Sequence, residues 1–530
     1  MGGGLLPALG GSVRMRPLIR RERITWRRAM FLAAARAAGR STGGARRFMA
    51  SRVLLLSPNW CRAPDPVFPL GLAHLNAALR RAGHQTSWFD CLLHGPSVEE
   101  RLAAFRPDFV GISVRNIDDV LIRKRETFFD GLKGLVAAIR RQARCPVILG
   151  GSGFSIFPQS LMELAEADFG ICGEGDRSLV ELLEALNHGA PHSGIPGLVF
   201  RHNGQLRVNP PAGPTAPLEL READRPAPIT EYYLRTSGML NLQTQRGCAF
   251  HCCYCTYPQI EGRRHYRRPA EIVAEEFEQL QRLGARHAFI VDAVFNSCPE
   301  HVAEVCQALL RRQLKITWSC FLRPQGLTAE LVKLMARAGL TNIEFGSDSL
   351  CDEVLAAYQK DLSFDDILQA SALAAREHID YCHFLICGGP GETRQTLRLA
   401  FDNSRRLPGA VFMAVVGMRI YPGTPLSQRA LADGLVGPDH DLLRPTYYVA
   451  PQLTADEIFA QLQEFARRQP NWVAGDPTPA YLSLVERLRQ RGIIGPLWSY
   501  FSLLQRLWPP SGTHDPHRSS AAPLRADPGL

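Results

Sequence analysis

The chain has 530 residues, of which 45% are hydrophobic and 21% are charged. This length predicts about three domains, and the composition excludes wholesale disorder, a collagen-like fibre and a coiled coil. The net charge of +10 comes from residues 1–50, which hold eleven arginines and one glutamate, so the other 480 residues are neutral and we expect no nucleic-acid partner. No apolar run is long enough to span a membrane, and we expect a cytoplasmic protein.

Residues 1–50 are rich in glycine, alanine and arginine and show no helical or strand period. We interpret them as a disordered leader or as the product of a start codon placed too early, with Met49 as the alternative beginning. Arg27 and Arg28 resemble a twin-arginine export signal, but Arg36 and Arg40 interrupt the apolar region that should follow.

Residues 51–190 alternate short apolar runs with amphipathic segments, one of which predicts a helix over 71–83. The strand-like runs are 52–58, 85–90, 108–114, 146–151 and 168–174. This alternation predicts a doubly wound, Rossmann-like parallel sheet, which binds ligands beyond the carboxyl ends of its strands. Residues 191–240 are predicted to be a connector, with a hairpin at Asn203-Gly204 and a proline-rich linker over 210–228.

The alternation resumes over residues 241–428 with a second set of strand-like runs. They are 241–247, 287–295, 315–323, 342–349, 381–389 and 411–420, and the clearest helix between them is 328–339. Six consecutive β/α units predict a partial (β/α)6 barrel of the TIM type, with its chemistry at the carboxyl ends of the strands. Residues 429–510 predict a helical C-terminal extension, and residues 511–530 a disordered tail.

Four of the fourteen cysteines fall within eight residues, directly after the first barrel strand. Cys248, Cys252 and Cys255 have the spacing C-x-x-x-C-x-x-C. Three thiolates on one short loop can hold three irons of a four-iron cluster and leave the fourth iron open for a substrate or cofactor. The alternative is a zinc site with Cys253 or His251 as fourth ligand. We interpret Cys253 as a small packed hydrophobic residue.

Three motifs carry a resemblance to the radical S-adenosylmethionine (radical SAM) superfamily. They are the cysteine loop, the turn at 388–393 that resembles G-x-P-G-E-T, and the turn at 421–426 that resembles Y-P-G-T-P-L. The resemblance implies a [4Fe-4S] cluster held by the three cysteines, whose open iron chelates S-adenosylmethionine. It also implies an external one-electron reductant of the flavodoxin or ferredoxin type and the release of a 5′-deoxyadenosyl radical.

The resemblance also implies residues that contact S-adenosylmethionine. Tyr254 corresponds to an aromatic residue that packs near the adenine, and Gly389 and Glu392 belong to the G-x-P-G-E-T turn. The polar residues at the ends of the second, third and fourth barrel strands are Asp292, Arg323, Ser347 and Asp348. Each of these four could instead cap a helix or line the barrel rim.

The front domain resembles the cobalamin-binding domain of one subclass of this superfamily, although the D-x-H-x-x-G signature of the lower axial histidine is absent. The predicted cobalamin contacts are Ser113, Arg115, Gly150, Gly151, Gly173 and Glu174. Arg115 could approach the lower face of the corrin, where a cation cannot ligate cobalt. The alternative, which we slightly prefer, pairs Arg115 with Asp118 or Asp119.

These features together predict a cobalamin-dependent radical SAM enzyme that methylates an unactivated carbon of a small-molecule, lipid or natural-product substrate. One alternative is a cobalamin-dependent radical cyclase or rearrangement enzyme without methyl transfer. A methylthiotransferase needs a second cluster in the front domain, whose Cys61, Cys91, Cys145 and Cys172 form no clustered triplet. The alternative from another class is a non-catalytic corrin- or metal-binding sensor.

Overall fold

The computed structural model describes residues 50–60, 66–93, 95–213, 223–407, 409–469, 471–474, 479–493 and 495–500. The predicted leader, the centre of the proline-rich linker, Cys61 and the predicted C-terminal tail lie outside the described residues. Within the described part, no helix is both long and apolar enough to cross a membrane.

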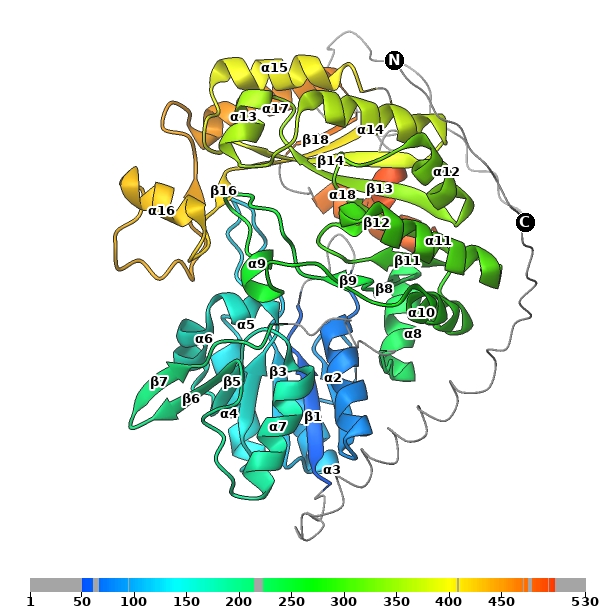
Figure 1. Cartoon of the computed structure of the whole chain (residues 1–530). Coiled ribbons are helices and arrows are strands. Elements are labelled where there is room, and N and C mark those ends of the chain that lie inside the picture. Colours follow the sequence, from blue (N-terminus) through cyan, green and yellow to red (C-terminus); the bar gives the residue numbers. More distant parts are fainter. Residues whose placement is uncertain are drawn as a thin grey trace, which may run out of the picture. The chain divides into compact units, whose positions relative to one another are not determined.

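The first sheet has seven strands in the order β2-β1-β3-β4-β5-β6-β7 (Figure 1). Its strands are β1 (Arg52–Ser57), β2 (Gln85–Asp90), β3 (Phe109–Ser113), β4 (Val147–Gly150), β5 (Phe169–Ile171), β6 (Leu198–His202) and β7 (Gln205–Val208). Its helices are α2 (Leu70–Arg81), α3 (Val98–Phe105), α4 (Leu132–Gln142), α5 (Ser152–Ile156), α6 (Pro158–Ala165) and α7 (Gly175–Asn187). The first five strands are parallel, as predicted.

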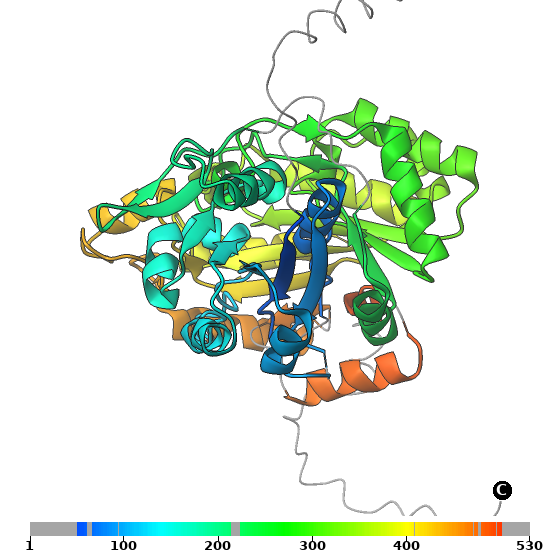
Figure 2. The ribbon, with the colours of Figure 1, turned by 90° about the horizontal axis from the view of Figure 1, so that it is seen from below.

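Both faces of this sheet are buried, which explains why its strands are apolar at consecutive positions. Val53 and Leu55 pack toward α2 and α7, whereas Leu54 and Leu56 pack toward α3, α4 and α6. Figure 2 shows the helices around this sheet from below. The hairpin at Asn203-Gly204 forms as predicted, but β6 pairs antiparallel with β5 and so extends the first sheet. The sequence predicts this hairpin as part of the connector, because the pairing of an antiparallel edge strand with a sheet leaves no local sequence signal.

The second sheet is parallel throughout and has the order β8-β11-β12-β13-β14-β15-β18. Its strands are β8 (Met239–Leu242), β11 (His287–Ile290), β12 (Thr317–Leu322), β13 (Leu340–Asp348), β14 (Asp380–Cys387), β15 (Val411–Val416) and β18 (Trp472–Ala474). The helices between them are α10 (Ala270–Arg282), α11 (Pro299–Arg312), α12 (Ala329–Arg337), α13 (Asp352–Ala357), α14 (Phe364–Arg376), α15 (Arg394–Ser404) and α17 (Ala455–Arg468). This architecture confirms the predicted fold class.

The second sheet differs from the prediction in one respect, because it has a seventh strand. Trp472 is buried and stacks on Phe412 of β15, with ring centroids 4.9 Å apart. The segment predicted to be a helical extension thus also contributes a strand, β18, to the sheet. A run of only three residues gives too short a pattern to be recognised as a strand.

Shorter elements complete the described part of the chain. Two pairs of short strands, β9 (Gln245–Arg246) with β10 (Tyr266–Arg267) and β16 (Met418–Arg419) with β17 (Tyr447–Tyr448), are antiparallel. The remaining helices are α8 (Ala227–Ser237), α9 (Tyr257–Ile260), α16 (Pro425–Ala432), α18 (Pro479–Gln490) and the 3-10 turns η1 (Phe295–Ser297) and η2 (Leu497–Tyr500).

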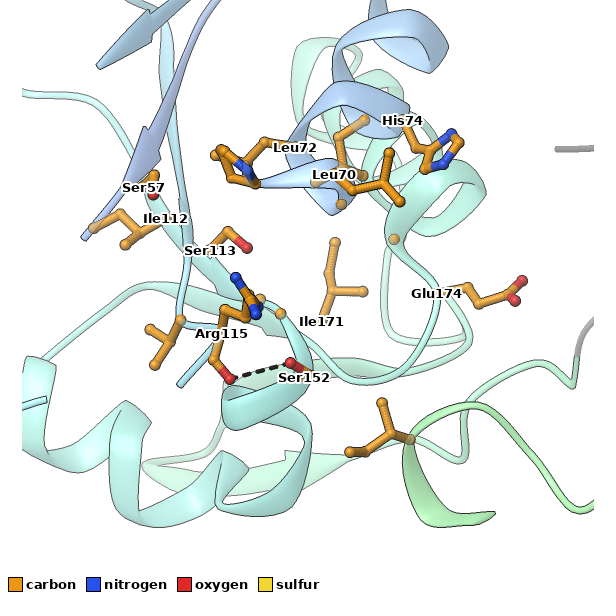
Figure 3. A pocket seen from close by; sticks show the side chains of 18 of the residues that line it. Ser57, Leu70, Leu72, His74, Ile112, Ser113, Arg115, Ser152, Ile171 and Glu174 are labelled. Carbon is orange, nitrogen blue, oxygen red and sulfur yellow. Dashed lines mark hydrogen bonds between the residues drawn. The ribbon is translucent and has the colours of Figure 1, made fainter. Parts of the chain in front are cut away.

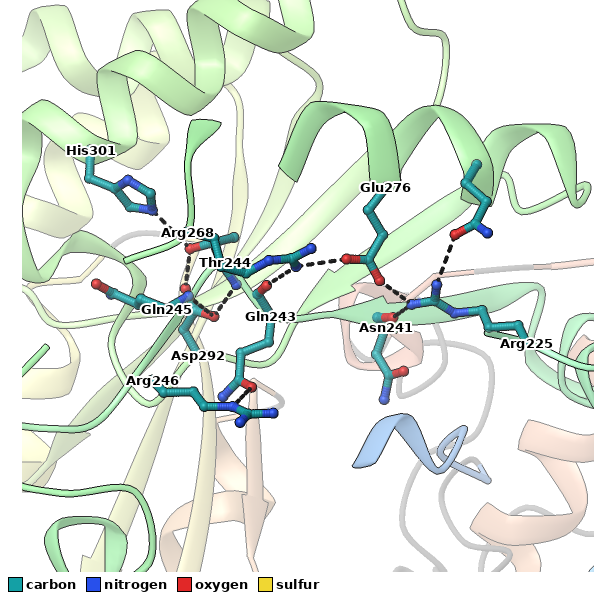
Figure 4. A network of polar contacts seen from close by, with 11 residues as sticks. Arg225, Asn241, Gln243, Thr244, Gln245, Arg246, Arg268, Glu276, Asp292 and His301 are labelled. Atoms are coloured by element: carbon teal, nitrogen blue, oxygen red, sulfur yellow. Dashed lines mark hydrogen bonds and ion pairs between the residues drawn. The ribbon is translucent and has the colours of Figure 1, made fainter. Parts of the chain in front are cut away.

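Glu276 of α10 lies at the centre of a buried charge network (Figure 4). Its carboxylate oxygens are 2.5 Å from Arg225 Nη2 and 2.7 Å from Arg268 Nη1, and all three side chains are inaccessible to solvent. Burial would raise the pKa of Glu276, but the two guanidinium groups hold it at about 2. Arg225 also donates to the carbonyl of Asn241, whose side-chain amide donates to the carbonyl of Phe68 in the first domain. The network therefore joins the connector, the barrel and the front domain.

We expect Glu276→Gln to destabilise the protein by about 3–5 kcal/mol, because it leaves two buried guanidinium groups without a counter-charge. The matched control on the same helix is Glu278→Gln, which breaks a half-exposed pair with Arg312 and should cost less than about 1 kcal/mol. Urea unfolding of both variants provides the measurement. Equal losses would show that the buried network has no special role in stability.

Candidate functional site

The cysteine loop runs from the end of β9 to the start of α9, and a glycine fixes its beginning. Gly247 has φ of 86°, and a Cβ added to it would lie 1.8 Å from the carbonyl oxygen of Arg264. No other residue fits there without moving the backbone. The next residue, Cys248, donates its N–H to the carbonyl of Gly262 (3.0 Å), and Cys255 N–H donates to the carbonyl of Cys252 (3.1 Å).

The three spaced cysteines are buried or half-buried, and burial raises the pKa of each thiol, that of Cys255 to about 12. Backbone N–H groups oppose this effect, from Phe250 at Cys248 and from Tyr257 at Cys255. Buried thiols that accept N–H hydrogen bonds suit metal ligation, in which the metal takes the place of the proton. Among the described residues, no three His, Cys, Asp or Glu side chains converge closely enough to hold a single metal ion.

Cys253 points into the apolar core, as predicted. It is 4% exposed and belongs to the same buried cluster as Val354, Tyr358 and Leu426. Its backbone is held from two directions, because its N–H donates to the carbonyl of Tyr358 (3.0 Å) and its carbonyl accepts from Leu426 N–H (2.9 Å). These two hydrogen bonds fix the middle of the cysteine loop.

The two motif turns, 388–393 and 421–426, hydrogen-bond to Cys253 or to the residue that holds it, Tyr358. In the turn at 421–426, Leu426 bonds Cys253, and the Pro422 carbonyl accepts from the Gln259 side chain (3.2 Å) just beyond the loop. In the turn at 388–393, Gly389 N–H donates to the Tyr358 hydroxyl (3.1 Å), and a Cβ on Gly389 would lie 2.4 Å from that oxygen. The turns therefore brace the loop that carries the cysteines.

The predicted S-adenosylmethionine contacts fall into two groups in the structure. Tyr254 and Asp348 lie together, since the Tyr254 hydroxyl donates to Asp348 Oδ2. Arg323 lies beside the loop, with its guanidinium 4.3 Å from the centre of the Phe250 ring. Lys360, which the sequence analysis missed, bonds Asp348 Oδ2 (2.7 Å) and the carbonyl of Gly346 (2.8 Å).

The other predicted contacts form hydrogen bonds with residues of the barrel. Asp292 is fully buried and accepts from Thr244 N–H (2.7 Å), the Thr244 hydroxyl (2.5 Å) and Gln245 N–H (3.2 Å), while burial raises its pKa to about 7. The Ser347 hydroxyl bonds the ring of His383 (2.8 Å). Burial raises the pKa of Glu392 to about 7, and its carboxyl accepts from Gly388 N–H, which closes the turn that contains Gly389.

A cavity of about 440 Å³ lies at the carboxyl ends of β1, β3, β4 and β5. It is lined by all six predicted cobalamin contacts, Ser113, Arg115, Gly150, Gly151, Gly173 and Glu174. Figure 3 shows Arg115 and Ser113 in the middle of this lining, with His74 and Glu174 toward one edge. The cavity therefore lies at the edge of the sheet where the alternation of the first domain predicts ligand binding.

Residues on both sides of the cysteine loop also line the cavity, and no sequence motif marks them. Arg246, two residues before Cys248, lines the cavity and pairs with Glu174 (3.0 Å). Tyr257, two residues after Cys255, also lines it. The cavity and the cysteine loop are therefore parts of one site.

Both carboxylates considered as partners for Arg115 have other partners in the structure. Asp118 is buried and pairs with Arg419 Nε (2.8 Å), and Asp119 is 3.9 Å from the Lys124 ammonium. Arg419 lies about three hundred residues further along the chain. The barrel therefore supplies a partner for Asp118 that proximity in the sequence does not indicate, and the pairing of Arg115 stays a prediction.

Comparison with known proteins identifies both domains. Residues 62–183 match the B12 binding domain family, and residues 242–402 match the radical SAM superfamily. The chain therefore belongs to the radical SAM enzymes that carry a cobalamin-binding domain, whose cofactors are a [4Fe-4S] cluster, S-adenosylmethionine and cobalamin.

The chain is similar to a solved structure and to several proteins of related sequence. The radical SAM methyltransferase TsrM from Kitasatospora setae, solved with cobalamin and a [4Fe-4S] cluster, has a TM-score of 0.77 at 23% identity and covers 87% of this chain and 98% of its own. A tryptophan 2-C-methyltransferase from Streptomyces laurentii is 26% identical over 70% of this chain and 73% of its own. A hopanoid C-3 methylase from Methylococcus capsulatus is 25% identical, and the match covers 84% of this chain and 87% of the methylase. An anaerobic magnesium-protoporphyrin IX monomethyl ester cyclase from Rubrivivax gelatinosus is also 25% identical, and the match covers 67% of this chain and 65% of the cyclase.

Gly71 tests whether the cavity has room for a corrin. It lies in α2, lines the cavity, and a Cβ there would meet nothing within 4 Å, so the protein itself does not require glycine. Gly71 is the second residue of α2, so open space for a ligand lies beside the start of this helix. This space and the three thiols of the cysteine loop are what a corrin and an iron–sulfur cluster would need at this site.

We expect Gly71→Leu to weaken cobalamin binding at least tenfold, or by at least about 1.4 kcal/mol, because the leucine side chain fills the cavity. The unfolding free energy of the cobalamin-free protein should not fall, because leucine favours the helix more than glycine does. The control is Gly134→Leu in α4, another helical glycine with nothing within 4 Å. Titration followed by corrin absorbance measures the affinity. Unchanged binding by Gly71→Leu would place the corrin elsewhere.

Proposed function

We propose that the protein is a cobalamin-dependent radical SAM methyltransferase acting on an unactivated carbon of a small-molecule, lipid or natural-product substrate. The observation that carries this proposal is the shared wall of the site. Arg246 and Tyr257 stand on either side of the cysteine loop and both line the cavity of the B12-binding domain. A corrin in that cavity is therefore adjacent to the loop that binds the cluster.

Cys248, Cys252 and Cys255 are the proposed cluster ligands, and the cavity residues hold the corrin. When bound, these groups supply a transferable methyl group and a radical able to abstract hydrogen. The chain positions them and excludes water. The Cys253 backbone bonds orient the loop, the Arg246–Glu174 pair holds the loop stem against the cavity, and an external flavodoxin- or ferredoxin-type protein supplies electrons.

A second candidate function is radical cyclisation without methyl transfer, favoured by the similarity to the cyclase. Both functions use the same described site, and the difference lies in whether S-adenosylmethionine donates its methyl group. Anaerobically reconstituted protein with reduced cobalamin distinguishes them before any substrate is known. A methyltransferase releases S-adenosylhomocysteine stoichiometrically with cobalamin, whereas a cyclase releases only 5′-deoxyadenosine on reduction of the cluster. Absence of S-adenosylhomocysteine contradicts the proposal.

We expect Cys252→Ser to lose cluster iron and its absorbance, because one of three thiolate ligands is removed. Its control is the adjacent Cys253→Ala, which should keep the cluster and cost about 1 kcal/mol of stability through a small core cavity. Iron and sulfide analysis of both reconstituted variants decides the assignment. Loss of the cluster in Cys253→Ala, with retention in Cys252→Ser, would overturn it.

A further inference from the structure

Two buried cations lie beside the cysteine loop, one packed on an aromatic residue of the loop and one linked to the loop through Asp348. The Arg323 guanidinium lies over the ring of Phe250, between the first two cysteines. Lys360 bonds Asp348, which in turn accepts from the hydroxyl of Tyr254, between the last two cysteines. The loop therefore lies against a charged layer supplied by the ends of β12 and β13 and by the segment after α13.

The members of this layer are fixed to one another. Arg323 Nη2 donates to the carbonyls of Lys360 and Asp361, and its Nε donates to Gln325 Oε1 (2.7 Å). Lys360 and Asp348 are each only about 5% exposed. Charges held in place away from solvent are weakly screened, so their effect on neighbouring groups is large.

The charges beside the loop have opposite signs. Lys360 and Arg323 are cations and Asp348 is an anion, and Asp348 is hydrogen-bonded to the Tyr254 hydroxyl of the loop. A cation near a site stabilises negative charge there, and an anion destabilises it. Lys360 thus favours negative charge on the loop, and Asp348 disfavours it. Reduction of a cluster bound there adds one negative charge in the same place.

We propose that the Lys360–Asp348 pair sets the reduction potential of the cluster held by the cysteine loop, with Lys360 favouring the reduced state and Asp348 the oxidised state. This inference rests on the proposed cluster site. The step is a one-electron reduction by an external low-potential donor, with no bond made or broken in the protein. Lys360 and Asp348 are positioning residues in this role, because they act through the charge they place beside the loop.

The test is a redox titration of the full-length reconstituted protein without S-adenosylmethionine, using dithionite as donor and electron paramagnetic resonance as readout. Asp348→Asn keeps an acceptor for Tyr254 but removes the negative charge, so it should raise the ratio of reduced to oxidised protein at a fixed potential at least threefold. Lys360→Met should lower the ratio at least tenfold, which is about 59 mV for one electron. Lys333→Met, on the exposed face of α12, is the control and should leave it unchanged.

A purely structural ion pair predicts a different result, since breaking it from either side would shift the ratio in the same direction or not at all. Either outcome overturns the inference, as does an Asp348→Asn ratio equal to that of the unaltered protein. If Lys360→Met binds no cluster, the sign of the Asp348→Asn shift decides alone. Absence of an iron–sulfur cluster from the unaltered protein refutes the proposed function itself, so the two failures are distinguishable.

Discussion

The site depends on the two hydrogen bonds that hold the backbone of Cys253. The carbonyl of Tyr358 and the N–H of Leu426 fix this residue from two directions, and its side chain fills an apolar position. The turns at 388–393 and 421–426 both hydrogen-bond to these anchoring residues, so in this chain the two motifs help to hold the cysteine loop in place. Cys252 and Cys255 lie on the same short loop as Cys253, so the hydrogen bonds of Cys253 also position them. Cys253 itself packs in the apolar core and is not a proposed metal ligand.

The second constraint is the burial of charge where the two domains meet. Glu276 with Arg225 and Arg268, Asp118 with Arg419, and Glu174 with Arg246 join segments far apart in the sequence. Breaking one partner of a buried pair is costly, so these contacts favour a single arrangement of the cavity and the loop. Chemistry that passes a methyl group or a hydrogen atom between cofactors and substrate needs such fixed distances.

Local pattern predicted the regular architecture, and tertiary contacts account for what it missed. The strand at Gln85–Asp90 and the hairpin at Asn203-Gly204 carry clear signals, and the six residues predicted as cobalamin contacts line the cavity at the strand ends. β18 is too short for periodicity, and Lys360, Arg246 and Tyr257 lie in no motif; only the fold brings them to the loop. The partner of Asp118 was missed for the same reason, because Arg419 comes from a distant segment.

Mössbauer spectroscopy of the ⁵⁷Fe-reconstituted protein, recorded with and without S-adenosylmethionine, shows whether three thiolates leave one iron of the cluster open beside the corrin cavity. We expect four irons in one cluster, with the signal of a single iron changing when S-adenosylmethionine binds. A spectrum that does not respond, or a protein that takes up zinc at the cysteine loop instead, would refute this arrangement.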